Sequence, residues 1–381
     1  MKLHGTLVRG GTSKCWIFDA AQIDGLGIDR DRALLIAFGA EDRRQLDGVG
    51  GATSTTSKAA IVGPSVRADC DVDYTFAQVG IGEPSVEWGS NCGNCATAVG
   101  LYAVQTGVVA AMDPVTTVRI HNTNTGTVAE TVVATPGGAV PISGAARVPG
   151  VVQPGVPVDL TFVDPAGGST GTLLPTGHPV DLLPSGSGAV RATLADAGAP
   201  SVLVAADDLG LIGTESPRVL GPEAERLVAL RRAAALAMGL VDEHDPLPQA
   251  IPKVGIVGPP AAYRTTDGSA VDAADYDLSV RMLSMGGPHP AIGLTAAVAV
   301  LSAATVPATL PALFGRQLAG TGSLRIGTAA GVVVARIDRS DDSGPRRVTL
   351  SRAARCIATA ELFLPGPQLT PVGSADHIHS A

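Results

Sequence analysis

The first half of the chain alternates short apolar runs with turn-forming residues. Within residues 1–180, stretches rich in Val, Ile, Thr and Ala are separated by Gly, Pro, Asn and Asp. This pattern is typical of short β-strands in an antiparallel all-β arrangement. The predicted strands cover residues 2–10, 13–19, 57–63, 72–81, 116–124, 127–135 and 156–164.

Two segments of this half have helical character. Residues 28–40 carry apolar side chains at helical spacing. Residues 91–107 begin with a polar turn and continue with small and apolar residues on nearly every face. A helix without a polar face is buried on all sides, so we expect this one to lie inside the strands.

The same order of elements recurs in the second half. A stretch rich in Pro, Gly and Ser at residues 175–188 indicates a crossover between domains. After it come a predicted strand at 201–213, a helix at 222–240, and a glycine-rich turn that leads into an apolar helix at 286–306. A β shell wrapped around an apolar helix accounts for both copies.

The repeat predicts how the chain divides. We expect an α+β protein with an N-terminal domain at residues 1–184 and a C-terminal domain at residues 185–365. Residues 366–381 are predicted to be a loose tail.

The composition excludes several classes of protein. Hydrophobic residues make up 45% of the chain and charged residues 16%, so intrinsic disorder is excluded as its general state. The net charge of −8 argues against a nucleic-acid-binding protein. The N-terminus lacks a secretory signal, and the longest apolar segment, residues 291–305, is too short for a membrane span. We therefore expect a cytoplasmic protein that binds neither nucleic acid nor membrane.

Lysine is rare in this chain. Of the 27 cationic residues, only Lys2, Lys14, Lys58 and Lys253 are lysines. An ammonium group can lose its proton and act as a base, which a guanidinium practically cannot. Lys58 directly precedes apolar strand residues, where partial desolvation would suit it to acid/base work. The alternative is a solvated surface lysine.

Three segments combine Gly, Ser, Thr or Asn with a reactive side chain: residues 9–14, 50–58 and 90–95. Each alone is typical of a turn, but together their N–H groups, hydroxyls and cations suit the oxygens of a carboxylate. Neither the G-x-x-x-x-G-K-[ST] nor the G-x-G-x-x-G pattern is present in the required context, so nucleotide binding is not supported. The substrate contacts predicted from these segments are Thr12, Ser13, Thr55, Ser57, Asn91, Gly93 and Asn94.

Cys92 lies where the polar turn becomes the first apolar helix. The helix N-terminus is expected to lower the pKa of its thiol, so that Cys92 can take and return a proton. Alternatively, Cys92 and Cys95 are two small buried residues, or a redox or metal C-x-x-C pair. A zinc site would need a second pair of ligands, which the sequence lacks, so we expect no metal. The five cysteines are odd in number and sparse, which predicts free thiols.

Other polar residues have two interpretations each. His289, at the start of the second apolar helix, could bind a carboxylate or cap its turn. Asn122, in the segment HNTNTG, could contact substrate or form a turn.

Six segments, in this order and spacing, resemble the PrpF family, and the similarity spans nearly the whole chain. This family includes 2-methylaconitate isomerase, 4-oxalomesaconate tautomerase and 3-methylitaconate isomerase. The segments are RGGTSK (9–14), GGATSTTSK (50–58), SNCGNCATAVG (90–100), NTNTG (122–126), IPKVGIVGPP (251–260) and RMLSMGGPHPAIGLTAAVAV (281–300).

The resemblance implies the diaminopimelate-epimerase fold, with two pseudo-symmetric β barrels, each closed around a central helix, and an active site between them. It also implies cofactor-independent proton transfer on unsaturated di- or tricarboxylates. By position, Lys58 matches the catalytic lysine of the family and Cys92 matches the cysteine of its S/G-N-C-G-N motif. We expect Arg281, Ser284 and His289 to contact the substrate, and we note a homodimer as one assembly for the protein.

The chain departs from the family pattern at three places. Cys15 replaces a more usual Gly, Cys95 is an additional thiol, and GLTAAVA replaces G-T-G-A-V-A. The epimerase relatives use one cysteine from each domain, but residues 288–295 contain none. A symmetric two-thiol racemase mechanism is therefore not expected.

The hypothesis is an isomerase that catalyses a 1,3-allylic proton shift or a cis-trans isomerisation, with Lys58 or Cys92 removing a carbon-bound proton. Hydroxyls, amides and a cation such as Arg281 would stabilise the oxyanion that develops. Two alternatives stay open: a non-catalytic carboxylate-binding accessory protein, and an amino-acid racemase or epimerase on the same fold. The sequence does not choose among the candidate substrates.

Overall fold

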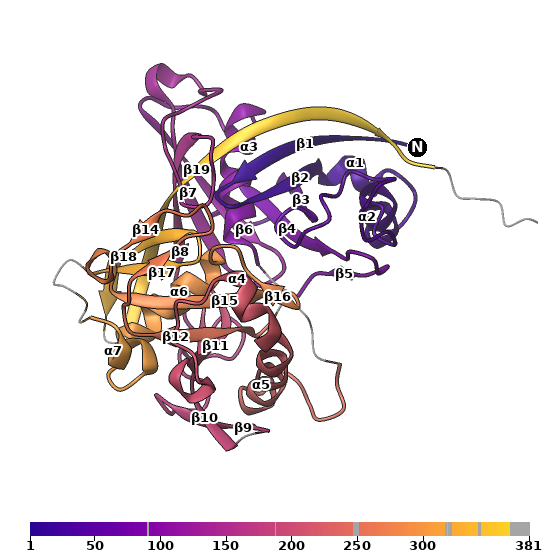
Figure 1. Cartoon of the computed structure of the whole chain (residues 1–381). Helices are drawn as coiled ribbons and strands as arrows, with labels where there is room; N and C mark the ends of the chain where they lie inside the picture. Colours follow the sequence, from indigo (N-terminus) through magenta and orange to yellow (C-terminus); the bar gives the residue numbers. More distant parts are fainter. Residues whose placement is uncertain are drawn as a thin grey trace, which may run out of the picture.

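The structure is a computed structural model that describes residues 1–89, 91–186, 188–246, 251–316, 318, 322–341 and 344–365. The predicted tail at residues 366–381 lies outside the described residues. Within the described parts, seventeen strands form one continuous sheet, and β13 (Tyr263–Arg264) and β14 (Ala270–Val271) form a separate hairpin (Figure 1). None of the described helices is both long and apolar enough to cross a lipid bilayer.

Eight strands of the sheet close into a barrel. Hydrogen-bonded neighbours follow the order β1, β2, β3, β4, β6, β7, β8 and β19, and β19 pairs again with β1. The strands are β1 (Lys2–Gly10), β2 (Ser13–Asp19), β3 (Lys58–Pro64), β4 (Val72–Val79), β6 (Val115–Asn122), β7 (Val128–Ala134), β8 (Val156–Val163) and β19 (Gly344–Phe363).

The apolar helix predicted at residues 91–107 is α3 (Gly93–Gln105), and it is buried inside this barrel. Small residues make the fit. A Cβ at Gly100 would lie 2.1 Å from Thr131 Oγ1, and a Cβ at Gly10 on β1 would lie 1.9 Å from the carbonyl oxygen of Asn94. The backbone of α3 therefore approaches the shell more closely than any larger side chain would allow.

The expected antiparallel arrangement is wrong at two places. β2 pairs with β3 in parallel, and so does β4 with β6. Parallel neighbours need a long crossover connection, usually helical. The first crossover contains α1 (Ala20–Asp24) and α2 (Arg30–Phe38), and the second contains β5 (Val86–Glu87) and α3.

The second half repeats this order of pairing. β10 and β11 are antiparallel, β11 and β12 parallel, β12 and β15 antiparallel, β15 and β17 parallel, and β17 and β18 antiparallel. One isolated bridge, between Ala166 and Ala197, joins the end of β10 to the residues after β8. The strands are β10 (Gly188–Ala197), β11 (Ala199–Ala205), β12 (Lys253–Gly258), β15 (Leu278–Ser284), β17 (Ser323–Thr328) and β18 (Gly331–Asp341).

The buried helix of the second half is α6 (Leu294–Ala304), which contacts β10, β11, β17, β18 and β19. The crossover from β11 to β12 contains α4 (Pro217–Leu220) and α5 (Ala224–Ala237), and the one from β15 to β17 contains β16 (Gly287–Pro288), α6 and α7 (Leu310–Phe314). The predicted helix at residues 222–240 thus corresponds to α5.

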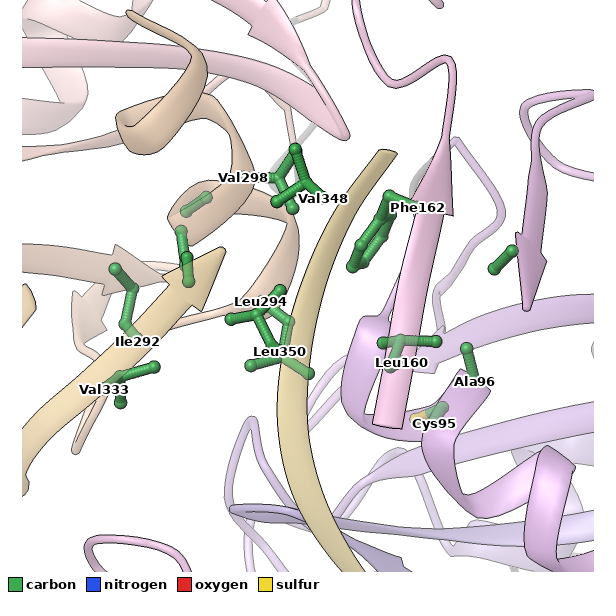
Figure 2. Close-up of a cluster of buried hydrophobic side chains, with 14 of the residues drawn as sticks. Cys95, Ala96, Leu160, Phe162, Ile292, Leu294, Val298, Val333, Val348 and Leu350 are labelled. Carbon is green, nitrogen blue, oxygen red and sulfur yellow. The ribbon is translucent and has the colours of Figure 1, made fainter. Parts of the chain in front are cut away.

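The two buried helices approach each other through one continuous core. Figure 2 shows Leu160 and Phe162 of β8, and Val348 and Leu350 of β19, between the α3 and α6 side chains. A Cβ at Gly93, the first residue of α3, would lie 2.8 Å from Cβ of Leu294, the first residue of α6. The N-terminal ends of both helices therefore meet at the centre of the molecule.

Two strands bear on how the chain divides. β9 (Asp181–Ser185) pairs with β10 and includes the predicted boundary, in a stretch interpreted from sequence as a connection. β19 pairs with β18 of the second half and with β8 and β1 of the first. We retain two domains, divided near residue 184, as a proposal, with β19 shared between them.

Candidate active site

A cleft opens where the N-terminal ends of α3 and α6 meet. Residues from both halves line it, and none of the described lining residues is acidic. The first half contributes Ser13, Lys58, Phe76, Gln78, Asn91, Cys92, Gly93 and Asn94; the second contributes Arg231, Pro252, Lys253, Val254, Met282, Leu283, Ser284, Met285, His289, Gly293, Leu294, Thr295 and Ala296.

The structure thus gathers eight of the predicted site residues in one place, although they come from four separate parts of the sequence. These are Ser13, Lys58, Asn91, Cys92, Gly93, Asn94, Ser284 and His289.

Lys58 is the first residue of β3, and only 7% of it is exposed. Its Nζ donates a hydrogen bond to Oε1 of Gln78, the residue opposite it on β4. Gln78 is itself held by a 2.8 Å hydrogen bond from Nε2 to the carbonyl of Ser57. The ammonium also lies 5.0 Å from the centre of the Phe76 ring. Lys58 is therefore an oriented group of the cleft wall and not a solvated surface lysine.

Cys92 is the N-cap residue of α3, as predicted, and its side chain is partly buried. The predicted lowering of its pKa is wrong. A hydrogen bond with the Cys95 thiol and burial raise the pKa of Cys92 well above its ordinary value, and the charge of Lys58 opposes them only in part. Desolvation disfavours the thiolate more than the helix end favours it. Cys92 is therefore a thiol at neutral pH.

Cys95 does not face the cleft. It is buried in the first barrel with Cys15, and burial together with Cys15 raises its pKa well above the ordinary value. Within the described parts of the chain, no three His, Cys, Asp or Glu side chains are grouped as ligands of a metal ion would be.

His289 is buried in the wall that the second half contributes. Burial, and then the charges of Lys58 and Lys253, lower the pKa of its imidazole to about 3. The backbone N–H of Ala291 donates a 2.9 Å hydrogen bond to Nδ1. A neutral imidazole whose Nδ1 accepts carries its proton on Nε2. His289 therefore both caps its turn and offers one N–H donor.

The opening of α3 combines amides and hydroxyls. Asn94 Nδ2 donates to Thr12 Oγ1 at 3.1 Å and to Ser13 Oγ at 3.5 Å. Thr12 thus supports the site through Asn94 without lining the cleft. The amide oxygens of Asn91 and Asn94 are buried and accept no hydrogen bond within the described chain. The first N–H groups of a helix also have no partner inside it. Hydrogen-bond donors and acceptors therefore lie close together at this end of the cleft.

Two other predicted contacts lie in the loop before β3, outside the cleft. Ser57 is buried, donates from Oγ to the carbonyl of Val79 at 3.0 Å and accepts from Gln45 Nε2 at 2.7 Å. Thr55 contacts the Thr53 hydroxyl at 3.3 Å, and its carbonyl accepts from the backbone N–H of Lys14. Both residues shape the loop that precedes Lys58.

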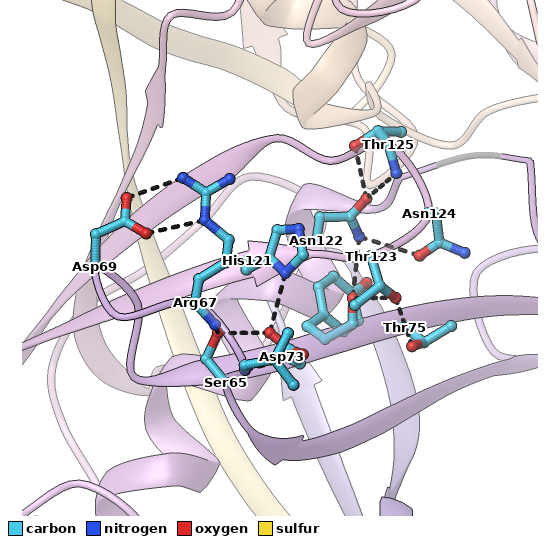
Figure 3. A network of polar contacts seen from close by, with 12 residues as sticks. Ser65, Arg67, Asp69, Asp73, Thr75, His121, Asn122, Thr123, Asn124 and Thr125 are labelled. Carbon is cyan, nitrogen blue, oxygen red and sulfur yellow. Dashed lines mark hydrogen bonds and ion pairs between the residues drawn. The ribbon is translucent and has the colours of Figure 1, made fainter.

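Asn122 is also placed away from the cleft, in a turn network at the end of β6 (Figure 3). Its Nδ2 donates to Asn124 Oδ1 at 3.1 Å, and its Oδ1 accepts from both the backbone N–H and the hydroxyl of Thr125. The structure thus favours the turn-forming interpretation of Asn122.

Arg281 is not brought into the cleft. Its guanidinium is buried and donates to four backbone carbonyls, those of Thr214, Glu215, Val280 and Gly327. It also lies 4.7 Å from the centre of the Tyr263 ring. Alternate residues of a strand point to opposite faces, so Met282 faces the cleft while Arg281 holds the outer connections.

Sequence reasoning did not select Lys253, Arg231 or Gln78 as site residues. Lys253 is the first residue of β12, and burial together with the charge of Lys58 lowers its pKa to about 8. A signal for Lys253 was present, because KVGIVGP at 253–259 repeats KAAIVGP at 58–64. Arg231 on α5 comes from the helix packed outside β12, which only the tertiary structure reveals.

Known proteins match this chain over nearly its whole length. A family model described as PrpF protein matches residues 1–365. The chain is 38% identical to 2-methyl-aconitate isomerase of Shewanella oneidensis, over 96% of this chain and 98% of that protein. It is 34% identical to 3-methylitaconate isomerase of Eubacterium barkeri, over 96% of this chain and 97% of that protein.

Solved structures give the same result for the fold. The crystal structure of a methylitaconate-delta-isomerase superposes with a TM-score of 0.78 and 32% identity, covering 100% of this chain and 99% of that chain. A hydroxyproline epimerase from Agrobacterium vitis superposes with a TM-score of 0.56 and 12% identity, covering 95% of this chain and 91% of that chain. The predicted α+β fold of the diaminopimelate-epimerase type is confirmed.

Proposed function

Because the chain belongs to the PrpF family, we propose that it is an isomerase that moves a proton along a small unsaturated di- or tricarboxylate. The relatives named above are isomerases of 2-methylaconitate and methylitaconate. We propose acids of this class, including oxalomesaconate, as the substrates of this chain.

One observation carries the proposal: a lysine and a thiol from separate elements line a cleft that contains cations and no described acidic residue. The whole chain has a net charge of −8, so the positive charge of the cleft is opposite in sign to that of the protein. Carboxylates of a polyanion find Lys58, Lys253 and Arg231 there. The reacting carbon would then lie against Lys58 and Cys92.

The structure supports a division of labour between these two residues. Cys92 retains its proton at neutral pH, so it can donate a hydrogen bond or a proton but cannot readily remove one. Lys58 would remove the carbon-bound proton next to a carboxylate. The electron pair then spreads into an enolate-like oxyanion, and a proton returns at the other end of the allylic system.

The oxyanion would be met by donors that are already in place. These are the Cys92 thiol, Nε2–H of His289 and the first N–H groups of α3. Such preorganised donors are usually the largest catalytic contribution, and each positioned acid or base adds about 10²- to 10⁴-fold.

The test uses the purified protein in deuterated water with 2-methylaconitate, 3-methylitaconate and 4-oxalomesaconate in turn. We expect double-bond migration and incorporation of deuterium with at least one acid, followed by NMR. Absence of both with every acid would overturn the proposal. Binding of an acid without exchange of its protons would instead indicate the accessory-protein alternative.

A racemase of this fold receives no support from the cleft. The N-cap residue of α3 is Cys92, whereas the N-cap residue of α6 is Gly293. The described cleft lining therefore has a thiol on one side only.

We further propose that the reaction requires no cofactor and takes place in the cytoplasm. Full activity after exhaustive dialysis against a chelator would support cofactor independence, and loss of activity that an added metal restores would contradict it. A homodimer stays a proposal, which sedimentation of the purified protein tests directly.

A further inference from the structure

The two halves of the molecule place a lysine at the same position. Lys58 begins β3 and Lys253 begins β12, and these strands are equivalent in the repeated order of pairing. The segments that follow, KAAIVGP at 58–64 and KVGIVGP at 253–259, are identical at five of seven positions. The chain has four lysines in all, so the coincidence is informative.

The neighbours of the two lysines are also equivalent. On β4, Phe76 pairs with the residue two positions after Lys58; on β15, Met282 pairs with the residue two positions after Lys253. Phe76 and Met282 both line the cleft, and so do Gln78 and Ser284, each two residues further along its strand. Lys58 and Lys253 therefore enter one cleft from its two halves.

The symmetry ends at the buried helices, because the N-cap residue of α3 is Cys92 and the N-cap residue of α6 is Gly293. Among the described lining residues of the second half, only Lys253, Arg231 and His289 can carry a positive charge. The guanidinium of Arg231 does not release its proton in practice, and His289 is held as a neutral imidazole. Of these three residues of the second half, Lys253 is therefore the one that can exchange a proton near neutral pH.

The surroundings of Lys253 suit it to give up a proton. Burial, and then the charges of Lys58 on β3 and Arg231 on α5, disfavour the charge of Lys253, while Glu87 on β5 favours it. His289 lies close enough to be affected by the charge of Lys253. With a pKa of about 8, Lys253 is mostly ammonium at pH 7 and a stronger acid than an ordinary lysine.

We infer that Lys253 is the general acid of the second half, which returns the proton to the substrate after Lys58 has removed one. This inference rests on the proposed function, which leaves the returning group open. In the step, the C–H electron pair moves into the allylic system as the proton passes to the Lys58 amine. The Lys253 ammonium then protonates the other terminal carbon and becomes an amine. Proton exchange with water resets both lysines.

The test compares Lys253→Arg and Lys253→Gln with the wild-type protein on the acid that the wild type converts best. Arginine retains the charge but cannot supply the proton. We expect Lys253→Arg to lose at least about 10²-fold in kcat with KM changed less than about threefold. In deuterated water it should still exchange the proton that Lys58 removes, because abstraction survives. Lys14→Arg, outside the cleft lining, is the matched control.

The outcomes separate the inference from the proposed function. Wild-type kcat in Lys253→Arg, with a raised KM in Lys253→Gln, would show that Lys253 only binds a carboxylate and would overturn the inference alone. If the wild type converts none of the acids, the proposed function itself fails. The wild-type kcat should also fall as pH rises through about 8, and a Cys92→Ser variant should retain that decline. Circular dichroism confirms that each variant is folded.

Discussion

The buried cationic side chains of this protein have different hydrogen-bond and charge partners. Lys58 and Lys253 lie in a cleft without a described acidic neighbour in its lining, whereas Arg281 is fully engaged by backbone carbonyls. Sequence patterns identify residue type and spacing, but not the partner a side chain finds. This is why the partly desolvated position of Lys58, at the start of an apolar strand, was predictable and the structural role of Arg281 was not, while Asn122 kept two interpretations.

Lys58 and Cys92 should respond differently to replacement. Lys58→Met removes the only amine on the first-half wall among the described lining residues, so we expect isomerisation to fall by at least about 10²-fold. Cys92→Ser keeps a hydroxyl donor and should lose less. Steady-state kinetics and deuterium exchange provide the measurements, with Lys14→Met as the control. Full activity of Lys58→Met would refute its assigned role.

Arg281 should affect stability and not catalysis. Arg281→Met leaves four buried carbonyls without their donor, so the free energy of unfolding should decrease by at least about 2 kcal/mol. Urea denaturation measures this, and turnover per folded molecule should be unchanged. Arg336→Met is the control, because the partly exposed Arg336 side chain makes a 4.0 Å ion pair with Asp338 and a 3.4 Å hydrogen bond to the Ser351 hydroxyl, so its loss should cost little. A raised KM with unaltered stability in Arg281→Met would restore its predicted substrate contact.

The sequence predicts a helix or strand where the residues of that segment alone form a recognisable pattern. The buried helices α3 and α6 were predicted because no face of either segment is polar. The parallel pairings of β2 with β3 and of β4 with β6 were not, because period-two alternation does not report strand direction. β9 and β10 were missed because turn-forming residues surround them. The repeat KxxIVGP is a local signal in the sequence that marks Lys253 as the counterpart of Lys58.

The fit of α3 in its barrel gives a prediction about an element. Gly100→Ala places a methyl group against the Thr131 side chain, and we expect the free energy of unfolding to decrease by about 1–3 kcal/mol. The double variant Gly100→Ala/Thr131→Ala should recover part of that loss. Gly221→Ala, where nothing lies within 4 Å of the new methyl group, is the control. Thermal unfolding measures all of them; equal stability of Gly100→Ala and the wild type would contradict the close packing.

At the scale of the whole molecule, charged groups join strands that are distant in sequence. Glu130 on β7 is buried and forms ion pairs with Arg119 on β6 and Arg347 on β19. The Arg347 hydrogen bond and charge, together with the charge of Arg119, hold its pKa below the ordinary value despite burial. This contact helps to close the first barrel along a strand that belongs to both halves.

The Glu130 contact predicts a dependence of stability on pH. A carboxyl group whose pKa is lowered on folding contributes stability above its unfolded pKa, and the contribution is lost as pH falls through the folded pKa. Wild type should therefore be more stable than Glu130→Gln at neutral pH, and the difference should shrink as pH falls below about 4.3. Denaturation curves at a series of pH values provide the measurement. A difference that is constant with pH would show that the charge of Glu130 is not what stabilises the barrel.

The position of β19 in the chain has a consequence for biosynthesis. β1 and β8 lie side by side with β19, but a ribosome makes them long before residues 344–363. Until that segment emerges, both strands expose an edge with unpaired N–H and C=O groups, which is a template for pairing with other chains. The barrel of the first half therefore remains open while the second half is synthesised. During that time it is accessible to chaperones and can pair wrongly with other chains. Closure of the first barrel is therefore a late event that follows synthesis of the second half.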